Sequence, residues 1–112
     1  MNIEAPAYIA KQTEREFQRT VVDAARTFGW FVVAFPQMVG NPPGWPDLTM
    51  FRNGNTVLVE LKTERGKLSP RQLAMREDLK AHGMTVYVWR PSMWDDIVAL
   101  LEHEHVPWAD SE

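Results

Sequence analysis

The chain has 112 residues, of which 45% are hydrophobic, so it is long enough for one domain with a buried core. It contains no cysteine, which excludes a disulfide framework and a thiolate metal site and suits a reducing compartment. No apolar run reaches membrane-spanning length and the N-terminus carries no apolar signal segment, so we expect a cytoplasmic protein with no membrane partner.

The net charge of −3 is unevenly distributed along the chain. Residues 95–112 contain six acidic side chains and no Lys or Arg, so the rest of the chain is basic overall. An excess of Lys and Arg in residues 1–94 suits a polyanionic partner. From charge pattern alone, a solvated basic surface is the simpler explanation. We divide the chain into a flexible lead-in at 1–12, a folded domain at 13–101 and an acidic tail at 102–112.

A first helix is predicted from Glu14 to Thr27. Thr13 is a suitable N-cap residue, and Glu16 stands at the capping-box position three residues later. Gly29 follows the last periodic residue and ends the helix.

The helical phase separates the acids of this helix. With 100° per residue, four apolar side chains fall within about 60° of Glu14, namely Phe17, Val21, Ala25 and Phe28. Gln18 lies about 40° away. Glu16 lies about 160° from Glu14. We therefore expect Glu14 to point toward the core with Gln18 beside it, and Glu16 to face solvent. A first-turn acid that favours the helix dipole is the alternative explanation of Glu14.

A first strand is predicted at 30–35, followed by an irregular loop at 36–45 that contains three prolines and two glycines. Met38, Val39 and Trp45 make this loop unusually apolar. They fit three alternatives: contact with nucleobases, a dimer surface, or a flap over the core.

Two further strands are predicted at 47–51 and 55–63, joined by a short hairpin. Glu60 and Lys62 interrupt the second of these apolar runs and share one face, because strand side chains alternate. The hairpin would set Asp47 near Glu60. Two carboxylates and a lysine at a strand end suit an oxygen-ligated divalent cation and a water nucleophile. A structural ion pair between Glu60 and Lys62 is the alternative.

The rest of the chain predicts a helix, a strand and a helix. Ser69 as N-cap, with Pro and Gln in the first turn, predicts a helix that runs to about Ala81. A strand follows at 84–90, and Ser92 is expected to cap a last helix that ends at Leu101. The complete order predicts an α/β sandwich with a mixed sheet, in which the last two strands are parallel.

These motifs resemble the PD-(D/E)xK nuclease superfamily and, within it, the VRR-NUC family with its small stand-alone members. The resemblance extends over about residues 13–101. It is carried by the following residues: Glu14, Gln18, Gly44-Trp45-Pro46-Asp47-Leu48, Val59-Glu60-Leu61-Lys62-Thr63, Gly66 to Gln72, and the strand from Gly83 to Arg90.

The resemblance implies a restriction-endonuclease-like αβββαβ core and a Mg²⁺- or Mn²⁺-dependent DNA endonuclease. On this interpretation Asp47, Glu60 and the backbone carbonyl of Leu61 ligate the metal. Glu14 binds a second metal ion or orients a metal-bound water. The resemblance also implies that small stand-alone members act as homodimers on branched DNA such as four-way (Holliday) junctions.

Lys62 would hold the attacking water or stabilise the charge on the phosphate. The resemblance places Gln72 beside the active site, in addition to its capping role. The residues expected to contact DNA are Lys62, Arg65, Lys67, Arg71 and Gln18.

Two alternatives to a nuclease remain at this point. A non-catalytic nucleic-acid-binding module with the same fold would be indicated by loss of Asp47, Glu60 or Lys62, and all three are present. The other is an interaction protein in which the Glu60–Lys62 pair is purely structural. Metal binding separates it from a nuclease, because such a protein would bind no metal.

Overall fold

The computed structural model describes residue 5 and residues 8–34 and 43–103. The expectations for Met38 and Val39, and most of the acidic tail, lie outside the described residues. No helix in the described part is long and apolar enough to cross a membrane.

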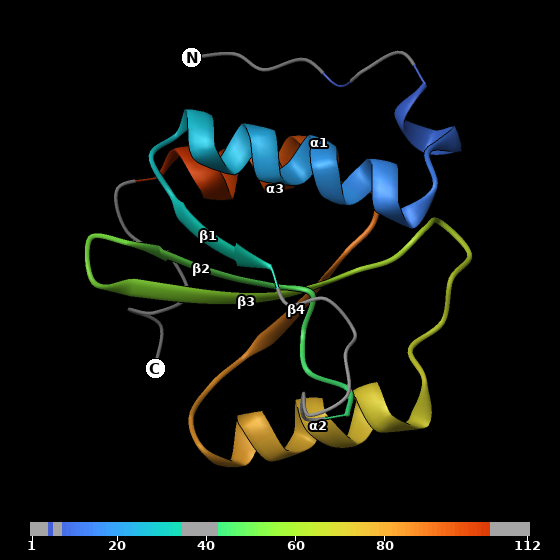
Figure 1. Ribbon diagram of the computed structural model, residues 1–112, viewed down its shortest axis with the longest axis vertical. Helices are drawn as coiled ribbons and strands as arrows, with labels where there is room; N and C mark the ends of the chain where they lie inside the picture. Colours follow the sequence, from blue (N-terminus) through green and yellow to red (C-terminus); the bar gives the residue numbers. More distant parts are fainter. Residues whose placement is uncertain (1–4, 6–7, 35–42, 104–112) are drawn as a thin grey trace.

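The fold is a mixed sheet between helices, which confirms the predicted α/β class (Figure 1). Within the described residues the strand order is β1-β2-β3-β4, with β1 and β2 antiparallel. The hairpin of β2 and β3 and the parallel pairing of β3 with β4 are as predicted. Helices α1 and α3 cover one face, and α2 lies on the other. The elements are α1 (Glu14–Thr27), β1 (Phe31–Ala34), β2 (Leu48–Arg52), β3 (Asn55–Leu61), α2 (Pro70–Ala81), β4 (Val86–Trp89) and α3 (Trp94–Glu102).

Two 3-10 turns differ from the expected course of the chain. The turn η1 (Ile9–Lys11) lies in the stretch expected to be irregular. Gln12, which follows it, is buried, and its side chain makes hydrogen bonds with the hydroxyl of Thr20. The turn η2 (Pro91–Met93) contains Ser92, so the prediction that Ser92 caps the last helix is wrong. The backbone N–H of Ser92 instead donates to the carboxylate of Glu64, and α3 begins at Trp94 without a side-chain cap.

The alternation of β3 divides the interior into two sides. Val57, Val59 and Leu61 are fully buried in the main core, together with Phe17 of α1 and Leu101 of α3. The residues between them on the strand must therefore point to the opposite face, on which α2 lies.

The ring of Trp30 ties α3 to the sheet. Its Nε1 donates to the carbonyl oxygen of Leu101 at 2.9 Å. The guanidinium of Arg52 lies 4.6 Å from the centre of the same ring and donates to the same carbonyl at 2.6 Å. The C-terminal end of α3 is thus satisfied by two donors from strand residues or their flanks.

We expect Trp30→Phe to lower the free energy of unfolding by about 1–2 kcal/mol, because it removes one hydrogen bond and weakens the cation–π contact. Tyr8→Phe is the control: this ring is 61% exposed, so loss of its hydroxyl should change stability by less than about 0.5 kcal/mol. Urea denaturation of both variants measures the difference. Equal effects would show that the Trp30 contacts do not hold α3.

Candidate metal centre

Three carboxylates from three different elements converge at one end of the sheet. Glu14 begins α1, Asp47 immediately precedes β2, and Glu60 lies near the end of β3. Each offers an oxygen within 4.8 Å of the other two. The β2–β3 register, which pairs Leu48 with Val59, places Asp47 opposite Glu60 as the hairpin predicted.

Asp47 is fixed by the strand beside it. Its Oδ2 accepts the backbone N–H of Leu61 at 2.8 Å, so the carboxylate is held at the end of β3. Gly44, three residues before Asp47, has a φ of +81°, and a Cβ here would lie 2.3 Å from the carbonyl oxygen of Arg71 in the first turn of α2. The backbone at position 44 can therefore pack this closely on α2 only with glycine.

One side chain, that of Gln72, makes both the capping contact with Ser69 and a contact with Glu60. Its Oε1 accepts the backbone N–H of Ser69 at 2.8 Å, and the Ser69 hydroxyl accepts the N–H of Gln72, which completes the capping box of α2. Its Nε2 donates to Oε1 of Glu60 at 2.9 Å. The cap thus fixes the amide that orients the buried carboxylate.

Crowding and burial perturb the acids of this cluster. Glu60 is only 2% exposed. Its burial, reinforced by Asp47 and opposed by Lys62, raises its pKa to about 9. Burial also raises the pKa of Glu14, with Lys62 opposing and Asp47 adding to the shift. With a pKa of about 9, the carboxyl of Glu60 carries a proton at neutral pH unless a cation replaces it.

The donor set fits a hard divalent cation. All three side chains offer carboxylate oxygens, which Mg²⁺ and Mn²⁺ accept, and Glu14 and Asp47 keep access to solvent that water ligands require. The raised pKa of Glu60 also favours a cation here, because it shows that the ionised carboxylate has too little positive charge around it.

Lys62 lies just beyond the last residue of β3, and its backbone N–H donates to the carbonyl of Trp89 at 3.0 Å. Its positive charge opposes the rise in the pKa values of Glu14 and Glu60 that their burial causes. Within the described part of the chain it makes no ion pair with Glu60. This geometry favours a side chain that is available to a ligand over a purely structural pair.

The structure brings Glu14 rather than Glu16 to the cluster. Glu16 faces solvent, and its carboxylate accepts the N–H of Thr13, which lowers its pKa. Gln18 is partly exposed and makes no hydrogen bond to Glu14 among the described residues. The expected DNA-contacting side chains Arg65, Lys67 and Arg71 are exposed.

Sequence reasoning did not identify the supports of this site. The contact of Gly44 with α2 and the bond from Leu61 N–H to Asp47 join positions far apart in the chain, so no local pattern indicates them. Arg90 was predicted only as the last residue of a strand, with no supporting role.

Comparisons with known proteins agree with this geometry. The sequence model of the VRR-NUC domain matches residues 10–93. A solved structure described as a VRR_NUC domain is 26% identical, with a TM-score of 0.67, and the alignment covers 82% of this chain and 97% of that chain. No curated protein matches the chain.

The raised pKa of Glu60 predicts a pH-dependent effect of metal on stability. Without metal the folded protein binds more protons than the unfolded one between the ordinary carboxyl pKa and about 9. This group therefore makes the metal-free protein less stable as pH rises through that range. Metal replaces the proton, so we expect Mg²⁺ to raise the melting temperature more at about pH 8.5 than at about pH 6.

Glu60→Gln should greatly reduce this difference between the two pH values, and Glu16→Gln should preserve it. Melting curves with Mg²⁺ and with a chelator measure the effect. An equal shift at both pH values in the wild-type protein would contradict the assignment of Glu60 as the proton-binding ligand.

Proposed function

Because this chain belongs to the VRR-NUC domain family of nuclease-type domains, we propose that it is a metal-dependent DNA endonuclease that hydrolyses phosphodiester bonds. The observation that carries the proposal is the convergence of Glu14, Asp47 and Glu60 within 4.8 Å at one end of the sheet. Lys62 and Gln72 support it, since one provides a cation beside the acids and the other orients Glu60.

We assign metal binding to Asp47, Glu60 and the backbone carbonyl of Leu61, with Glu14 as the third carboxylate. A bound Mg²⁺ or Mn²⁺ supplies an acidified water nucleophile and positive charge beside the phosphate. The chain's own contribution is to hold these oxygens in place: Leu61 N–H fixes Asp47, and Gln72 fixes Glu60. Such rigid ligands require little reorganisation during the reaction.

Lys62 acts on the substrate rather than on the fold. Its ammonium holds the attacking water or donates to a phosphate oxygen, where negative charge develops in the transition state. Burial of the adjacent Glu60 strengthens this electrostatic effect, because the local dielectric is low.

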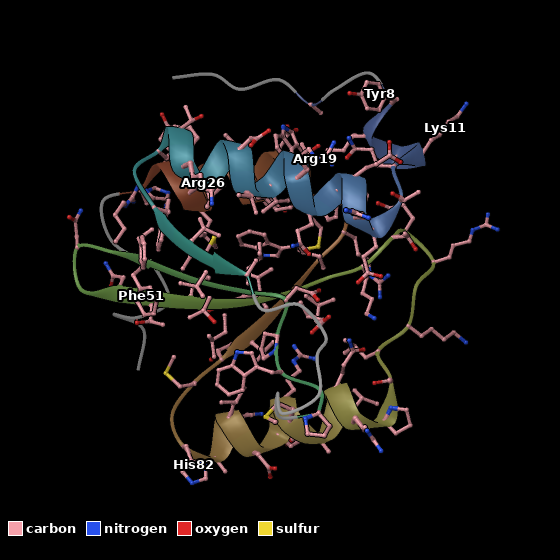
Figure 2. All side chains as sticks on the ribbon, viewed as in Figure 1. Tyr8, Lys11, Arg19, Arg26, Phe51 and His82 are labelled. Carbon is pink, nitrogen blue, oxygen red and sulfur yellow. The ribbon has the colours of Figure 1, made fainter. Side chains whose placement is uncertain are left out.

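We propose that the substrate is branched DNA, such as a four-way junction, and that the protein acts as a homodimer. A 112-residue chain is small for gripping two duplex arms, whereas a symmetric dimer would present two sites. The exposed side chains Phe31 and Phe51, 67% and 41% exposed with ring centres 6.2 Å apart, offer apolar surface for a partner. Figure 2 shows Phe51 near the end of the sheet at which the hairpin joins β2 and β3.

Cleavage of linear, flapped and four-way DNA, with and without Mg²⁺ or Mn²⁺, tests the proposal. We expect metal-dependent cleavage that is fastest on the branched substrates. Asp47→Asn and Glu60→Gln should each reduce the single-turnover rate by at least about a hundredfold, because each disturbs the electrostatics of the transition state. DNA binding should persist or strengthen, because repulsion of phosphate falls.

Light scattering and thermal melting control for assembly and folding. If the folded wild-type protein binds DNA but cleaves none of the substrates with either metal, the chain is a non-catalytic nucleic-acid-binding module. Full activity in either variant would remove that residue from the site.

Glu14→Gln and Glu16→Gln form a matched pair on one helix. We expect Glu14→Gln to reduce cleavage strongly, because its carboxylate lies in the metal cluster. Glu16→Gln should change stability by less than about 1 kcal/mol, since Gln also serves in a capping box. Single-turnover rates of the two proteins decide, and a dominant effect of Glu16 would show that the third carboxylate is misassigned.

A further inference from the structure

The loop between β3 and α2, residues 63–67, is folded around the guanidinium of Arg90. Nη1 of Arg90 donates to the carbonyl oxygens of Thr63 at 2.6 Å and Gly66 at 2.7 Å, and more weakly to that of Glu64 at 3.3 Å. The N–H of Gly66 also donates to the Thr63 carbonyl and closes a turn. Three carbonyls of one short loop therefore point inward to a single cation.

The planarity of the peptide bond fixes what the other side of this loop presents. In a trans peptide the N–H of the next residue points opposite to the carbonyl. The N–H groups of Glu64, Arg65 and Lys67 must therefore point away from Arg90. None of these three N–H groups has a hydrogen-bond partner in the part of the chain that the structure describes.

The charges of the loop favour an anion on its outer side. The side chains of Arg65 and Lys67 are exposed. The loop also contains one acid, Glu64. Its carboxylate accepts the backbone N–H of Ser92, two residues after Arg90, and is thereby held by that contact. Outward amides beside unpaired cations form the kind of surface that binds phosphate groups.

The position of the loop connects this surface to the metal centre. Lys62 immediately precedes it, and Ser69, which caps α2 and bonds Gln72, follows two residues after its end. In the chain, the loop thus lies between Lys62 and Gln72, two residues assigned to the proposed cleavage site. A strand whose scissile phosphate lies at the carboxylates would bring a neighbouring phosphate to this loop.

We propose that the 63–67 loop is a second phosphate site, which binds a non-scissile DNA phosphodiester through the N–H groups of Glu64, Arg65 and Lys67. Arg90 is the positioning residue that turns these amides outward and does not touch DNA itself. The inference rests on the proposed nuclease function, and it adds the amides and Arg90 to the side chains already assigned to DNA.

Amide NMR spectra of the ¹⁵N-labelled wild-type protein test the site directly. Short duplex DNA is added in the presence of Ca²⁺, which takes the same oxygen ligands. We expect the amide protons of Glu64, Arg65 and Lys67 to move downfield as they bond phosphate. The amide of Gly54, in the β2–β3 hairpin turn, is the control and should not move.

If other amides shift on addition of DNA while those of the loop stay in place, the phosphate site is overturned and the nuclease proposal stands. If no amide shifts and no DNA is cleaved, the proposed function fails. Because this measurement uses the wild-type protein, it does not depend on the folding of any variant.

Two Arg→Lys variants test the role of Arg90. Lysine keeps the charge but lacks the planar fork that reaches several carbonyls. Arg76 is the matched control, because its Nε also donates to one backbone carbonyl, that of Val86. We expect Arg90→Lys to raise the Kd for DNA about tenfold, by loss of charge-assisted hydrogen bonds from the loop, and Arg76→Lys to leave it unchanged.

The salt dependence of binding separates positioning from a direct charge contact. Arg90→Lys should weaken binding by a similar factor at low and high salt, because neutral amides release no counterions. Lys67→Gln should instead lower the slope of log K against log salt by about 0.9, the value for one lost phosphate contact.

The cleavage rate at saturating DNA gives a second readout. We expect Arg90→Lys to raise KM and to leave kcat close to that of the wild-type protein. Wild-type affinity in Arg90→Lys, or a change in its salt slope equal to that of Lys67→Gln, would overturn the positioning role.

Discussion

The burial of Glu60 beside Asp47 is the constraint on which this end of the molecule depends. A carboxyl that is 2% exposed and adjoins another acid carries a pKa of about 9, so its ionised form is unfavourable without compensation. The fold supplies a hydrogen bond from Gln72 and the charge of Lys62, which leaves the remaining deficit of positive charge to a cation. The burial of Glu60 is thus the one physical cause behind both the proposed metal chemistry and the expected loss of stability of the metal-free protein at high pH.

Helix α2 is the element that joins the parts of this site. It buries none of its residues completely, so its packing contributes little to the core. Its first turn nevertheless provides the amide that holds Glu60 and the carbonyl that Gly44 packs against. The main core lies instead on the opposite face of the sheet, where α1 and α3 pack against the strands. This separation lets the site side of the sheet carry charge while the other side remains apolar.

Local sequence determined much of the fold because its signals act over a few residues. Thr13 with Glu16 and Ser69 with Gln72 each form the predicted capping box. The helical phase that set Glu14 apart from Glu16 needs only a constant rotation per residue. The hairpin register then brought Asp47 opposite Glu60. Strand ends were less accurate, since β4 is two residues shorter at its start and one at its end than the predicted 84–90, because pairing with β3 decides where it begins.

Only the tertiary structure decided which backbone groups support the acids. The bond from Leu61 N–H to Asp47, the close approach of Gly44 to Arg71 and the clamp of Arg90 on the 63–67 loop join residues 14 to 27 positions apart. Periodicity contains no information about such contacts, because they depend on how separate elements pack. Ser92 shows the same limit: its sequence indicates a helix cap, but its N–H is taken by Glu64 from another loop. The sequence indicated which acids could act as ligands, and packing determined how those acids are held.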